Sequence, residues 1–174
     1  MELINKLERI VLGWVKNIPH LPATAQKWLG ANVWWIVLIG AIIGGIWFLF
    51  ALNSLFISFA LLNSISNSYY VINDLAGYTI FKGIVGLVLL GLAVAALAFA
   101  VMPLKDQQKK GWVLLFTSWL ISAISIVVSA ILSLSVIGFI ISIIFGAIFL
   151  AIGGYFLFEI HGQFAHPAKR AKKV

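Results

Sequence analysis

Four serines share one face of a strongly apolar segment, where a hydroxyl group could meet either water or another helix. Ser118, Ser122, Ser125 and Ser129 recur at spacings of four, three and four residues, which align on one side of an α-helix. Such a face could line a pathway for a solute. It could equally let a neighbouring helix approach closely, because a serine can donate to the carbonyl four residues back and needs no water. The spacing favours a packing seam and leaves the pathway as the alternative.

A second polar group lies in the stretch SISNSYYVINDLAGYTIFKG, residues 64 to 83. It holds Tyr69, Tyr70, Asp74 and Lys82, with which an external segment could recognise a ligand or gate a pathway. The simpler interpretation is a connection between two membrane helices. Tyrosine rings suit the membrane interface, Asp74 suits a turn or a helix cap, and Lys82 can extend its amine toward the surface. We favour the connection and keep these four residues as candidates for recognition or gating.

Ionisable residues are missing where membrane chemistry usually needs them. No such side chain lies near the middle of any predicted span, although pumps and intramembrane hydrolases normally use them. Four residues that could be grouped lack the spacing of a metal site: His20, Glu159, His161 and His166. We expect Glu159 to pair instead with the lysines between residues 105 and 110. The sequence therefore predicts no enzyme activity, no cofactor and no metal.

Composition places all these residues in a membrane protein. The chain has 174 residues, of which 63% are hydrophobic and 10% charged, whereas a soluble domain carries roughly 25% charged residues. It has no cysteine, so disulfides and thiolate chemistry are excluded. Its basic residues lack the interleaved aromatic platform of nucleic-acid binders. We expect an all-α integral membrane protein that binds no nucleic acid.

Hydrophobic runs predict four transmembrane helices, at about residues 33–52, 80–102, 112–133 and 138–158. Pro103 is expected to end the second of them. After Asn53 the apolar run resumes over residues 55–62. The first helix therefore either projects beyond the membrane or kinks near Asn53.

The flanking regions are amphipathic or basic. In residues 3 to 18, apolar side chains recur at helical spacing and would lie on one face of a helix, with charged side chains on the opposite face. This pattern predicts an interfacial amphipathic helix within a region spanning residues 1–31. Charged residues interrupt the first eighteen positions, so they contain no continuous apolar segment and we expect no cleavable signal peptide. The transmembrane domain would cover residues 32–158, and residues 159–174 form a basic tail. The expected lipid anchors are one aromatic and four cationic residues: Trp14, Lys169, Arg170, Lys172 and Lys173.

Cation counts predict the orientation. With four spans, eleven of the twelve lysines and arginines fall on one side of the membrane, and Lys82 alone falls on the other. Cytoplasmic segments carry the excess of Lys and Arg. We therefore expect a plasma (inner) membrane protein with both termini in the cytoplasm, where its cations meet anionic lipid headgroups.

Two runs of the sequence resemble those of small four-helix integral membrane proteins from Saccharibacteria-type reduced-genome bacteria: NKLERIVLGWVKNIPHLPATAQKWLGANVWWIVLIG and PLKDQQKKGWVLLF. The resemblance implies a four-helix membrane fold. It carries over no active-site residue and no function.

These features favour a non-enzymatic multi-pass membrane protein that acts through helix packing, oligomerisation or partner binding. Its partners would be membrane lipids, further copies of the chain or another membrane protein. The alternative is a small channel or transporter with a serine-lined pathway, which oligomerisation could complete.

Overall fold

The computed structural model describes residues 13, 19–65 and 70–165. Within these ranges the chain is all-helical, with α2 at Ala23–Ile65, α3 at Tyr70–Lys105, α4 at Lys109–Ile131, α5 at Val136–Glu159 and α6 at His161–Ala165. The first four helices are long and apolar enough to cross a membrane, which confirms the predicted class for the part of the chain described. The predicted amphipathic helix at residues 3–18, Gly13 apart, lies outside the described residues.

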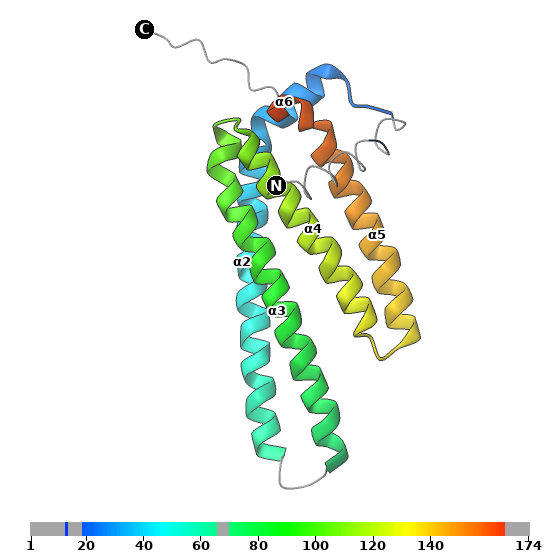
Figure 1. The fold of residues 1–174 in the computed structure, drawn as a ribbon. Coiled ribbons are helices and arrows are strands. Elements are labelled where there is room, and N and C mark those ends of the chain that lie inside the picture. Colours follow the sequence, from blue (N-terminus) through cyan, green and yellow to red (C-terminus); the bar gives the residue numbers. More distant parts are fainter. Residues whose placement is uncertain (1–12, 14–18, 66–69, 166–174) are drawn as a thin grey trace.

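The four long helices form two antiparallel hairpins, α2–α3 and α4–α5 (Figure 1). Helix α3 packs against both α2 and α4, whereas α5 packs against α4 and the short α6. Helices α2 and α5 do not pack along each other. We call the end of the bundle that carries α6 and the α3–α4 turn the α6 end, and the opposite end, with the α4–α5 turn, the turn end.

Helix α2 resolves the question raised at Asn53, because it runs through this residue without a break. Its 43 residues extend for about 65 Å at the α-helical rise of 1.5 Å per residue. It begins directly after Pro22, so residues 23–31 belong to the same helix as the first predicted span. The helix has no internal proline that would force a kink. The chain therefore continues as one helix past Asn53, as expected for a first helix that projects beyond the membrane and not for one that breaks at this residue.

Helix α3 differs from its predicted bounds at both ends. It begins at Tyr70, so Asp74 lies within the helix and not in a turn before it. Pro103 stands in its last turn, and the helix ends two residues later at Lys105. A proline there removes one backbone hydrogen bond and leaves the preceding helix intact.

The α3–α4 turn is tight. Gln107 has a positive φ of 54°, and the Gln108 N–H donates to the Pro103 carbonyl at 2.8 Å. Gly111 then brings α4 against the end of α3, since a Cβ on this glycine would lie 2.5 Å from the Leu104 backbone nitrogen. The close approach of the two backbones therefore requires glycine at this position.

The buried core is concentrated at the α6 end. Its largest fully buried side chains are Trp112, Phe116, Phe164, Leu104 and Ile160. Toward the turn end most apolar side chains are exposed, including Phe145 at 68% and Ile137 at 70%. In water such a surface would aggregate, whereas in a bilayer it meets hydrocarbon. The fold thus consists of one packed end and four long apolar helices that extend from it.

Candidate functional site

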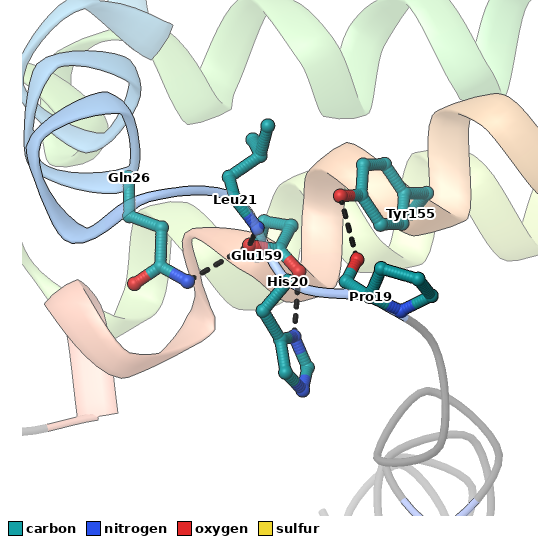
Figure 2. Close-up of polar contacts among 6 residues, drawn as sticks. All are labelled: Pro19, His20, Leu21, Gln26, Tyr155 and Glu159. Atoms are coloured by element: carbon teal, nitrogen blue, oxygen red, sulfur yellow. Dashed lines mark hydrogen bonds and ion pairs between the residues drawn. The ribbon is translucent and has the colours of Figure 1, made fainter.

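One carboxylate, that of Glu159, joins the two ends of the described chain. Its Oε1 lies 2.7 Å from His20 Nδ1, and its Oε2 accepts hydrogen bonds from the Leu21 backbone N–H at 3.0 Å and the Gln26 side chain at 2.8 Å. One turn earlier on α5, the Tyr155 hydroxyl donates to the Pro19 carbonyl at 3.0 Å. Figure 2 shows these six residues, Pro19 included, which we call the latch.

The local sequence explains why the latch forms. Tyr155 and Glu159 are four residues apart, so both project from one face of α5. Pro19 and Pro22 keep the segment before α2 out of a helix, which leaves the Leu21 N–H without a helical acceptor. The Gln26 N–H bonds to the Pro22 carbonyl at 3.0 Å, and this bond sets the first turn of α2. The latch therefore fixes the start of α2 to the end of α5.

The latch corrects the pairing expected for Glu159. The Glu159 side chain has no exposed surface, while that of His20 is 51% exposed. A buried carboxylate must be matched by donors, and here the three donors all come from residues 20–26. The prediction that Glu159 pairs with a lysine of the α3–α4 turn is wrong, because both carboxylate oxygens are already occupied. The contact with His20 is an ion pair when the imidazole is protonated and a hydrogen bond otherwise.

The histidines considered for a metal site contact different residues and do not form a group. His20 bonds to Glu159, and His161 packs against Trp112 with ring centroids 4.7 Å apart. His166 lies outside the described ranges. Across residues 19–65 and 70–165, no group of three potential ligands is placed to hold a metal ion.

Two indole groups fasten α5 onto α4. Trp112 Nε1–H donates to the Leu157 carbonyl at 2.9 Å, and Trp119 Nε1–H donates to the Leu150 carbonyl at 3.1 Å. Phe116 lies between the two indoles and stacks on both, with centroid separations of 5.3 and 5.9 Å. The α6 end of the α4–α5 hairpin is therefore rigidly packed.

A cavity of about 440 Å³ lies between α2, α4 and α5, and we call it the α2–α5 cavity. Three lining residues bring polar side-chain atoms to it, and each already has an acceptor. Ser118 Oγ donates to the Ala93 carbonyl and Ser122 Oγ to the Ser118 carbonyl, both at 3.0 Å, while the Trp119 indole is bonded as described above. The other lining residues are glycine or apolar: Leu29, Val33, Ile36, Val37, Leu97, Leu115, Phe149, Gly153, Phe156, Leu157 and Ile160.

A second cavity of about 400 Å³ lies between α3, α4 and α5 and meets the first at Ser122 and Phe149. We call it the serine cavity, because Ser125, Ser129 and Ser142 also line it. Within the described part of the chain, no acceptor or donor is found for these three hydroxyls. Its remaining walls are apolar or glycine: Leu89, Leu90, Ala93, Ile126 and Gly146.

The predicted serine face is thus divided by the structure. Ser118 is buried at 3% exposure and bonds across to α3, so it acts in packing. Ser122 bonds within its own helix. Ser125 and Ser129 turn toward the serine cavity, where the α5 residue Ser142 joins them.

The other predicted candidates do not converge with these serines. Tyr69 lies outside the described residues, while Tyr70 and Asp74 fall in the first two turns of α3. Lys82 is exposed further along the same helix. A neighbouring tyrosine that was not among the candidates, Tyr78, donates to the Leu132 carbonyl at 2.7 Å and ties α3 to the end of α4. The proposed lipid anchors Trp14, Lys169, Arg170, Lys172 and Lys173 all lie outside the described ranges.

No protein family, curated protein or solved structure matches this chain. Sequence reasoning missed the latch and the α2–α5 cavity. The cation count predicts that the segments carrying His20 and Glu159 lie on the same side of the membrane, but the separation of 139 residues between them gives no local signal of the contact.

Proposed function

We propose that this chain is a non-enzymatic multi-pass membrane protein that acts by assembling with itself or with another membrane protein. Its cations would place both termini on the cytoplasmic side of the plasma membrane. The observation that supports assembly is the serine cavity, in which three hydroxyls lack partners in the described chain. Unpaired polar groups in hydrocarbon cost free energy, and polar groups of a neighbouring helix can remove that cost.

The surroundings of the serine cavity agree with this proposal. Helix α5 packs against one other spanning helix, α4, so its remaining faces are open to a partner. Phe145 and Ile144 on these faces are 68% and 51% exposed. Helix association in membranes depends on close packing and interhelical hydrogen bonds, and the open side of α5 offers both.

The test compares the mass of the assembly with and without the three hydroxyls. Wild-type protein in a mild detergent is expected to run as more than one chain, or as one chain bound to a partner, in native mass spectrometry. The triple change Ser125→Ala, Ser129→Ala and Ser142→Ala should weaken that assembly about tenfold. The matched control is Ser54→Ala with Ser58→Ala, since the Ser58 hydroxyl bonds to the Ser54 carbonyl and both serines lie outside the cavity. An unchanged mass in the triple variant would contradict the proposal.

The second candidate is a small channel or transporter, and the same serine cavity is the observation that favours it. Water could satisfy the three hydroxyls in place of a partner helix. In that case vesicles containing wild-type protein would pass a solute or ion, and the triple alanine variant would abolish this flux while leaving the assembly intact. The apolar walls of the cavity and the lack of a predicted ionisable residue at mid-span make this the weaker candidate.

A further inference from the structure

We propose that the α2–α5 cavity holds one acyl chain of an anionic phospholipid as a resident ligand. This inference goes beyond assembly of the protein, because it concerns a different cavity and a small molecule. It rests on the polar contacts inside the cavity, on the way the cavity opens and on the charges at its α6 end.

Water is a poor occupant of this cavity. A buried water needs two to four polar partners, but the hydroxyl hydrogens of Ser118 and Ser122 and the indole N–H of Trp119 are already donated to carbonyls, so no lining side chain is left to donate to a water. The other lining residues are glycine or have hydrocarbon side chains. The cavity is therefore apolar in character, in contrast to the neighbouring serine cavity.

An empty void of about 440 Å³ is equally unfavourable. Protein interiors contain few voids larger than a water molecule, and the cost of an unfilled cavity rises with its volume. Since water is a poor occupant and no described side chain fills the space, an apolar molecule is the occupant that matches its walls.

The cavity opens directly toward the lipid-facing surface. Ile36 on α2 and Phe156 and Phe149 on α5 line it, and they are also 39%, 47% and 67% exposed. Helices α2 and α5 do not pack along each other, so the gap between them leads sideways into the bilayer. An acyl chain can enter without crossing any polar barrier.

The α6 end supplies the place for a headgroup. The latch lies at this end of the cavity, because Ile160 and Leu157 flank Glu159 and Leu29 follows Gln26. Four exposed lysines give this end of the described chain its positive charge: Lys27, Lys105, Lys109 and Lys110. Asp106 is exposed beside them, while Glu159 is buried in the latch. Basic residues at the membrane surface attract anionic headgroups, so the charge selects an anionic phospholipid.

The experiment counts lipids retained by the full chain. Protein reconstituted in vesicles of equal parts phosphatidylglycerol and phosphatidylcholine, with identical acyl chains, is transferred to mild detergent and measured by native mass spectrometry. We expect one phosphatidylglycerol per chain to persist. Ile36→Trp fills the cavity from α2 and Gly153→Leu fills it from α5, and each should reduce retention about tenfold. The matched control is Ile39→Trp, at a residue of similar exposure (47%) on the same helix that does not line the cavity.

Three results would overturn the proposal. The first is equal retention in the wild type, Ile36→Trp and the Ile39→Trp control. The second is retention of phosphatidylcholine in place of phosphatidylglycerol. The third is a change in the mass of the protein assembly, with no change in lipid count, when Ile36 is replaced, which would identify another protein helix as the occupant. Ile36 lies at the exposed rim, so this variant remains informative if Gly153→Leu fails to fold. The serine variants that test assembly do not line this cavity, so the two proposals fail independently.

Discussion

At the scale of single residues, the clearest feature is a buried carboxylate whose partners come from the opposite end of the chain. The sequence marks Glu159 as an isolated acid at a helix end, and the nearest cations by topology are the lysines of the α3–α4 turn. Tertiary packing instead buries this side chain against residues 20–26. Which donor reaches a buried acceptor depends on side-chain direction, and hydrophobic periodicity does not encode that direction.

The Glu159→Ala variant should lose about 2 to 3 kcal/mol of unfolding free energy, because three donors lose their acceptor and hydrogen bonds to charged groups are the stronger ones. The measurement is denaturant-induced unfolding in detergent. Asp106→Ala is the control, since Asp106 is an exposed acid at the same end of the bundle and its replacement should change stability by less than about 0.5 kcal/mol. Equal effects of the two substitutions would show that the latch has no structural role.

Gly111 and Gly86 provide a matched pair of helical glycines. A Cβ at Gly111 would meet the backbone of Pro103 and Leu104, whereas a Cβ at Gly86 would have no atom within 4 Å. Gly111→Ala should therefore destabilise the protein by about 2 kcal/mol or more, because backbone atoms cannot move aside. Gly86→Ala should be neutral or stabilise by up to about 1 kcal/mol through helix propensity. Thermal unfolding of both variants distinguishes these outcomes, and similar melting temperatures would contradict the close approach of α3 and α4.

At the scale of the helices, the sequence predicts that a helix is present better than it predicts where that helix begins and ends. Four apolar runs are sufficient to place four spanning helices, because a bilayer forces backbone groups to bond within each segment. Bounds are less certain, as Asn53 and Pro103 show: one is a polar residue inside a continuous helix and the other a proline in a last turn. The helices accommodate both residues because the helical hydrogen bonds on either side of Asn53 and before Pro103 are still formed. Composition alone does not reveal that these hydrogen bonds form.

Two neighbouring residues of the serine face, Ser118 and Ser122, should respond differently to alanine. Ser118→Ala removes the hydroxyl that bonds across to the Ala93 carbonyl of α3 and should cost about 1 kcal/mol. Ser122→Ala removes a bond within α4 and should change stability by less than about 0.5 kcal/mol. Unfolding in detergent measures both variants. A larger loss at Ser122 than at Ser118 would contradict a packing role for the buried end of this face.

At the scale of the whole molecule, the order of the helices in space is the part that the sequence leaves open. Short connections predict that consecutive helices are neighbours, α3 and α4 included, but they do not predict that α2 and α5 stay apart. That arrangement creates the α2–α5 cavity, and the latch closes the same gap at the α6 end. The α2–α5 cavity thus arises from a contact between α2 and α5 that is missing along the spans and present at one end.

Orientation in the membrane is the prediction that concerns the entire chain. Because the sequence contains no cysteine, single cysteines can report which side each connection occupies. Ser66→Cys lies between α2 and α3, and Asp106→Cys lies between α3 and α4. The excess of lysine and arginine predicts that the α3–α4 connection is cytoplasmic. A membrane-impermeant maleimide should therefore label Ser66→Cys in intact cells and Asp106→Cys only after permeabilisation. The reverse pattern would place the lysines of the α6 end outside the cell and remove the cytoplasmic leaflet as the source of the anionic lipid. Labelling of both positions in intact cells would contradict a single fixed orientation of α3 across the membrane.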